Sequence, residues 1–164
     1  MDPTYRAERQ PVRNEVIWMF KQVVWASDGS DAADRALELA RTLVQDSEGE
    51  LLCVHCKEIF AGRGGAFTAN VDEDKLQEKI EAQVEQLTHN GIKATLETAA
   101  TPVGGAAHVI ADAAQERDAD VIVVGTRGRT PLGGLLLGSV TQRLLHIARC
   151  PVLAVPAVNG LARD

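Results

Sequence analysis

Residues 121–128 read VIVVGTRG, a run of aliphatic, mostly β-branched residues that ends in a glycine-containing turn. The run shows no alternation of apolar and polar residues, which is typical of a strand buried on both faces. Such strands lie in the middle of parallel sheets that carry helices on each side. Ligands of these sheets bind beyond the carboxyl ends of the central strands. The segment therefore predicts an α/β fold with a binding loop after residue 124.

The rest of the chain alternates between expected strands and expected helices. Strands are predicted at 23–26, 51–56, 93–98, 121–124 and 152–155, and helices at 31–48, 72–89, 103–115 and 139–148. Ser30 suits the N-cap of the first helix, and Gly62, Gly64 and Gly65 predict a mobile loop. This order predicts an open, doubly wound α/β sheet with helices on both faces.

Length and charge limit the possible classes of protein. The 164 residues carry a formal net charge of −6 and are 45% hydrophobic, which fits one soluble domain. We predict a domain over 20–158, an N-terminal extension over 1–19 and a tail over 159–164. The acidic balance argues against nucleic-acid binding. Neither a membrane span nor a secretory signal is evident, so a cytoplasmic location is expected. Residues 16–20, VIWMF, predict either an element that covers the domain or an interface element.

A phosphate site is the strongest chemical signal. Gly125 and Gly128 follow the central strand, and Gly138 and Ser139 begin the next helix. A helix N-terminus offers unpaired N–H groups and the positive end of the helix dipole. Glycines allow the backbone to approach an anion, and a serine adds a hydroxyl donor. These residues predict a cradle for phosphate, although a flexible glycine-rich crossover has the same composition.

Three arginines surround this loop and add positive charge to an acidic chain: Arg127, Arg129 and Arg143. The last lies one helical turn after Ser139, so we expect it at the same end of the helix. The loop is not a Walker A sequence, because no lysine precedes Ser139. The dinucleotide fingerprint G-x-G-x-x-G is also absent after the first strand.

The spacing Gly-x2-Gly-x9-Gly-Ser resembles the nucleotide-binding signature of the universal stress protein family. Residues 23–30, 52–56 and 120–156 resemble the same family, so that the resemblance covers roughly 20–157. It implies a five-stranded parallel sheet of order 3-2-1-4-5, usually paired into a homodimer. Members with intact glycines bind ATP, and the resemblance therefore implies the ATP-binding branch.

The resemblance also implies roles for individual residues. Ala26 and Ser27 would line the base and ribose, Asp28 would contact the ribose or the metal–phosphate region, Cys56 would meet adenine, and Val124 would follow the base. The phosphates and ribose would be held by Gly125, Gly128, Gly138, Ser139 and Val140, with Arg127 beside them. Mg²⁺ would accompany the nucleotide. Strand alternation turns Trp25 away from the side of Ala26. The family often has Pro-Thr where Ala26-Ser27 stands and a β-branched residue at Cys56, which bears on base selectivity.

Three functions follow as hypotheses. The first is an ATP-binding regulator of the stress response, and the second is a sensor of AMP or a cyclic nucleotide. The third is a nucleotide-free, dimeric interaction protein. Any enzymatic activity would be at most slow ATP hydrolysis or self-phosphorylation, for which Asp28 is the candidate base. The last strand, 152–155, is an apolar edge that a second subunit would cover, in line with a homodimer.

Other polar residues favour structural roles. Cys53 and Cys56 form a C-x-x-C pattern, but residues three apart on a strand point to opposite faces, which favours buried structural thiols. The acidic helix 72–85 favours a solvated face. Packing or surface positions are also expected for the histidines, which are His55, His89, His108 and His146.

Overall fold

A computed structural model describes residues 20–62, 65–68, 72–129 and 137–156. The predicted tail and N-terminal extension lie outside these ranges, as does most of the apolar run 16–20. Among the described residues, no helix combines the length and apolar character that crossing a bilayer requires.

The sheet is built on five parallel strands, as predicted. Their order across the sheet is β4 (Lys93–Pro102), β2 (Glu50–Gly62), β1 (Gln22–Ser27), β5 (Val121–Gly125) and β6 (Val152–Val155). If the five parallel strands are numbered 1 to 5 along the chain, leaving out the antiparallel β3, this order is 3-2-1-4-5. The predicted fold class is therefore confirmed. The apolar run of β5 is fully buried and lies between β1 and β6.

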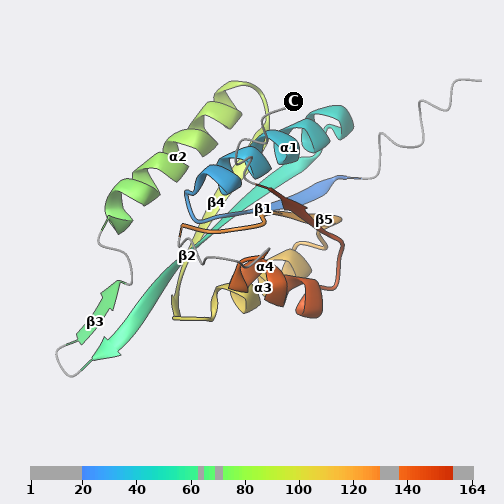
Figure 1. The fold of residues 1–164 in the computed structure, drawn as a ribbon. Coiled ribbons are helices and arrows are strands. Elements are labelled where there is room, and N and C mark those ends of the chain that lie inside the picture. The colour runs from blue at the N-terminus through green and yellow to red at the C-terminus, as the bar shows by residue number, and fades with distance from the viewer. Residues whose placement is uncertain (1–19, 63–64, 69–71, 130–136, 157–164) are drawn as a thin grey trace, which may run out of the picture.

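Helices cover both faces of the sheet (Figure 1). The first face carries α1 (Asp31–Ser47) and α2 (Glu73–His89), and the second carries α3 (Ala106–Glu116) and α4 (Ser139–Ile147). Strand alternation divides the core, because Trp25 packs on the first side and its neighbour Ala26 on the second. Trp25 therefore points away from the side of Ala26, as predicted.

Two of the three glycines predicted to form a mobile loop lie in paired strands instead, namely Gly62 and Gly65, whereas Gly64 lies outside the described residues. Strand β2 continues to Gly62, and a short strand, β3 (Gly65–Thr68), returns antiparallel to it, with Phe60 opposite Phe67. In Figure 1 this hairpin projects from the body of the domain. The glycines suggested a loop because a turn signal does not reveal whether the flanking residues pair. The expected strand end at 56 was wrong for the same reason.

The chain enters α3 later than predicted. The preceding strand extends to Pro102, and the helix begins at Ala106, not at 103. Gly104 has a φ of 87°, which a helix cannot contain, so a turn separates the two elements. The start of α3 lies beside the middle of β2, where the Cys56 thiol donates to the carbonyl of Ala106 at 3.8 Å.

Candidate functional site at the carboxyl edge of the sheet

A cavity of about 230 Å³ lies at the carboxyl ends of β1 and β5, beside the middle of β2. Strand β1 pairs with β2 on one side and with β5 on the other, so this is the point where the strand order reverses. The cavity wall contains every residue to which the family resemblance gives a nucleotide-binding role: Ala26, Ser27, Asp28, Cys56, Val124, Gly125, Arg127, Gly128, Gly138, Ser139 and Val140. Residues that are more than 100 positions apart in the sequence thus meet around one space, as Ala26 and Val140 do.

One end of the cavity is apolar. Ala26 and Val124 are neighbours across β1 and β5, and Val54 lies opposite Ala26 on β2. Helix α3 closes this end with Ala106 and Ile110. All five residues are buried, with 6% or less of each exposed. Burying a flat, uncharged group here would cost little free energy, because transfer of apolar surface out of water is favourable.

The other end is polar and is organised by Asp28. One carboxylate oxygen accepts a hydrogen bond from the backbone N–H of Ser30 at 3.1 Å. The second oxygen accepts from the backbone N–H of Arg129, also at 3.1 Å. Asp28 therefore joins the turn after β1 to the loop after β5, and its carboxylate retains lone pairs for further donors.

The start of α4 faces the same polar end. Its N-cap is Gly138, which has no side chain to satisfy the first N–H groups of the helix. Thr141 fixes the helix, because its hydroxyl donates to the carbonyl of Gly125 at 2.7 Å. Ser139 and Val140 line the cavity at the first helical positions. The geometry suits an anion, since unpaired N–H groups and the helix dipole meet there.

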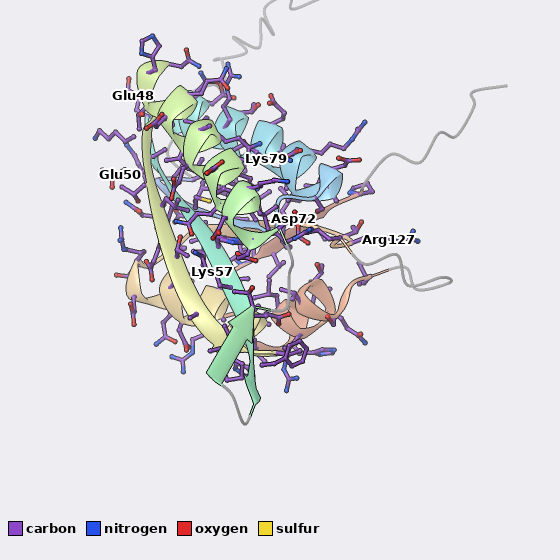
Figure 2. The ribbon with its side chains drawn as sticks, turned by 90° about the vertical axis from the view of Figure 1, so that its left-hand side faces the viewer. Glu48, Glu50, Lys57, Asp72, Lys79 and Arg127 are labelled. Carbon is purple, nitrogen blue, oxygen red and sulfur yellow. The ribbon has the colours of Figure 1, made fainter. Side chains whose placement is uncertain are left out.

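The arginines differ in their positions. Arg127 and Arg129 line the cavity with exposed side chains, and Figure 2 shows Arg127 at the margin of the molecule beyond the sheet. Arg143 is exposed on α4 and is not part of the wall, so the expectation that it faces the site was wrong. Position 143 is one turn along the helix from Ser139, but that turn presents Thr141 and Leu144 to the core instead.

Sequence reasoning missed several residues of the wall. Besides the α3 residues and Thr141, they include His55, Glu58 and Leu76. His55 is buried and forms a hydrogen bond of 2.9 Å to the carbonyl of Ser27 and one of 2.7 Å to Glu73. Glu73 is only 4% exposed, so the expectation of a solvated acidic face on α2 was wrong at this position. A histidine inside an apolar strand was the available signal, because a buried imidazole requires partners.

The cysteines lie on opposite sides of the sheet, as predicted from strand alternation. Cys53 is part of the core beneath α1 and α2, whereas Cys56 packs against the core beneath α3 and α4. Burial, together with the smaller effects of the nearby Glu58 and Glu97 carboxylates, raises the pKa of the Cys56 thiol to about 12. Burial also raises the pKa of Cys53. Thiolate, the nucleophilic form, is therefore scarce at neutral pH.

We expect Cys56 to be alkylated at pH 8 at least about 100-fold more slowly in the native chain than in urea, because its thiolate fraction falls with the raised pKa. The rate in the native chain should still climb above pH 9, where the unfolded thiol has already ionised. Mass spectrometry of the Cys56 peptide after iodoacetamide treatment measures both rates. Equal alkylation rates in the native chain and in urea would show that the thiol is not buried and that its pKa is not raised.

No cluster of three or more histidine, cysteine, aspartate or glutamate side chains within the described ranges could hold a metal ion. The carboxylates among the described wall residues are Asp28 and Glu58, and Asp28 is the one bonded to the loop after β5. Mg²⁺ commonly uses one or two carboxylates together with phosphate oxygens and water. The residues present therefore fit a metal that arrives with a phosphorylated ligand.

Comparison with known proteins identifies the family. The model of the universal stress protein family matches residues 19–156. The chain belongs to the universal stress protein family. A universal stress protein of Thermus aquaticus is 36% identical over 138 residues, which cover 84% of this chain and 99% of the relative.

Solved structures of universal stress proteins share the fold. The protein from Archaeoglobus fulgidus in complex with dAMP is 25% identical, with a TM-score of 0.60 over 83% of this chain and 97% of that one. A universal stress protein in complex with cAMP has the same TM-score of 0.60 at 21% identity, over 85% of this chain and 98% of that one. Similar universal stress proteins thus include members with bound adenine nucleotides.

Proposed function

We propose that this universal stress protein binds ATP in the cavity at the carboxyl edge of the sheet and acts as a nucleotide-dependent regulator of the stress response. One observation carries the proposal. The cavity has an apolar end suited to a base and a polar end suited to phosphates, at the reversal point of the strand order. The A. fulgidus relative in complex with dAMP supports an adenine nucleotide as the class of ligand.

The two ends of the cavity divide the nucleotide between them. Adenine would lie between Ala26, Val124 and Cys56, where aliphatic groups and a thiol replace aromatic stacking. The phosphates would lie against the N–H groups at the start of α4, in the gap that Gly128 leaves beside Asp28. Both contacts use groups that the ligand-free fold already holds in place.

Mg²⁺ would accompany the phosphates. When bound, the ion would neutralise part of the phosphate charge, with Asp28 as the protein carboxylate within reach. Asp28 already joins two loops through its hydrogen bonds to Ser30 and Arg129. It can therefore hold the polar end of the site in place whether or not it contacts the ion.

A sensor of AMP or a cyclic nucleotide is the second candidate. Arginines 127 and 129 are the cations among the described wall residues, which include no lysine for a terminal phosphate. The relatives with dAMP and cAMP favour the same alternative. Denaturing the purified protein and identifying the released nucleotide by chromatography separates the two. Release of ATP supports the first proposal, and release of AMP or cAMP supports the second. If no nucleotide is released and the protein binds none of the three when they are added, a nucleotide-free interaction protein is supported.

The three cysteines are unpaired thiols, which suits a reducing compartment such as the cytoplasm.

We also propose a homodimer that forms through β6. The strand is an edge of the sheet, and its Leu153 side chain is 38% exposed. Carbonyl groups of Pro151 and Val155 bond to β5, so the backbone groups of the alternate residue Ala154 face the open edge.

Replacing Ala154 with proline is expected to convert this dimer into a monomer. Proline removes an N–H that faces the edge and leaves the bonds to β5 in place. Light scattering coupled to size-exclusion chromatography measures the mass. A dimeric Ala154→Pro variant, or a monomeric parent chain, would contradict pairing through β6.

A further inference from the structure

One face of α2 packs against the turn that joins β1 to α1. Glu73, Leu76 and Lys79 are spaced three residues apart, so they lie along the same side of the helix. Figure 2 shows Lys79 partway along α2, with Asp72 at the start of the helix and α1 beside it. Each of the three residues contacts a group in or beside the turn 27–30. This turn contains Ser27 and Asp28 of the cavity wall.

Leu76 packs on the middle of the turn. Gly29 has a φ of 71°, and a Cβ atom at that position would collide with Leu76 Cδ1. The leucine is 9% exposed and belongs to the core beneath α1 and α2. The turn and the helix therefore fit together only because residue 29 has no side chain.

Lys79 fixes the same turn through hydrogen bonds. Its ammonium donates to the carbonyl of Gly29 at 2.8 Å and to a carboxylate oxygen of Asp34 at 2.7 Å. Gln83, one turn further along α2, donates to the other oxygen of Asp34 at 2.9 Å. The lysine side chain is 41% exposed, so the ion pair itself contributes little to global stability. Lys79 therefore acts locally, by holding the turn 27–30 in position.

Glu73 reaches the start of the turn through His55. The Nδ1 atom of His55 must carry a hydrogen, because the carbonyl of Ser27 can only accept. The Nε2 atom lies 2.7 Å from Glu73 Oε1, so a proton also lies between these two side chains. Both residues are buried, which strengthens the hydrogen bonds. The carbonyl that precedes Asp28 is thus held from α2.

We propose that Glu73 and Lys79 are positioning residues for the nucleotide site, and this inference rests on the proposed function. They hold the turn 27–30 from α2 without touching the ligand. Because the Asp28 carboxylate accepts a hydrogen bond from the backbone N–H of Arg129, the position of the turn also fixes the position of the loop after β5. The affinity for nucleotide then depends on a helix that lies outside the nucleotide signature.

Lys79→Met tests the proposal, with Lys75→Met as its matched control. Methionine keeps the aliphatic stem and removes the donor. Lys75 lies on the same helix with 83% of its side chain exposed and pairs with Asp72 at 3.6 Å, away from the turn. If the turn is correctly placed for about a tenth of the time in Lys79→Met, the Kd for ATP with Mg²⁺ rises about tenfold. Lys75→Met should bind like the parent chain.

Two further measurements separate positioning from general stability. Amide hydrogen exchange of residues 28–30 in the ligand-free protein should be at least about tenfold faster in Lys79→Met, with a melting temperature like that of the control. Glu73→Gln should bind nearly as well as the parent, because its amide can donate to Nε2 of a neutral His55. Glu73→Leu should bind more weakly.

Each outcome decides the inference. Equal affinities in Lys79→Met and Lys75→Met would overturn it and leave the proposed function intact. Weaker binding with unchanged exchange at 28–30 would also overturn it. A parent chain that binds neither ATP, AMP nor cAMP would refute the proposed function, and the positioning role with it.

Discussion

Replacing Gly128 with valine is expected to abolish nucleotide binding while the chain remains folded. A Cβ atom at this position would lie 2.6 Å from Asp28 Oδ2, the end of a side chain that can move. Asp28 and the loop would therefore shift, and the added side chain would occupy the space proposed for phosphates. We expect the Kd to rise at least about 100-fold, a loss of roughly 2.7 kcal/mol. Calorimetric titration measures the affinity, and a thermal melt checks the fold.

Gly138 provides the control and a companion variant. A Cβ atom there would meet Arg127 Cα and Gly128 N at 3.5 Å, which is ordinary contact. Gly138→Ala should therefore fold like the parent chain, so that any change in its affinity for nucleotide comes from the loop and not from a loss of stability. Gly138→Val should also fold but bind weakly, because its side chain would stand at the start of α4. Full affinity in both valine variants would mean that the phosphates do not lie at this loop.

Gly125→Ala is expected to damage folding instead. A Cβ atom at Gly125 would lie 2.7 Å from Ala32 Cβ and 2.9 Å from the carbonyl carbon of Ala32. The second contact is backbone of α1, which cannot move without the helix. Overpacking of this kind costs about 2–3 kcal/mol of unfolding free energy. The melting temperature should fall by roughly 5–10 °C.

Urea unfolding of Gly125→Ala and Gly128→Val in parallel separates the two roles. The first variant should lose stability, and the second should lose affinity. A loss below about 0.5 kcal/mol in Gly125→Ala would show that α1 does not pack against this glycine as closely as described. Gly125 would then have no special role in folding, and the proposed division between a folding glycine and a binding glycine would fail.

The strands and helices were largely predictable because their apolar periodicity is local. The sheet order came from the resemblance to a family, and it correctly placed Asp28 and Gly125 at the ends of neighbouring strands. The β2–β3 hairpin could not be predicted in the same way. Its pairing sets Phe60 opposite Phe67, and glycines between two segments give the same local signal whether or not those segments pair.

The cavity wall was predictable where backbone and small residues line it, since these carry the signature. The partners that arrive from other elements were not predictable. Glu73 looked like an ordinary acid in the first turn of a helix, although the fold buries it against His55. Lys79 lies on the helix that was expected to present a solvated face, although its ammonium donates to the carbonyl of Gly29, 50 residues away. Such contacts depend on how α2 docks, which its own sequence does not state.

Calorimetric titration of the purified, nucleotide-free chain with ATP and Mg²⁺ tests the proposed nucleotide site most directly. We predict saturable heat with one nucleotide bound per chain, and loss of that heat in Gly128→Val. AMP and cAMP, titrated in the same way, establish which adenine nucleotide binds most tightly. Absence of heat with all three ligands, from a chain that is folded by circular dichroism, would contradict the assignment of this cavity to a nucleotide.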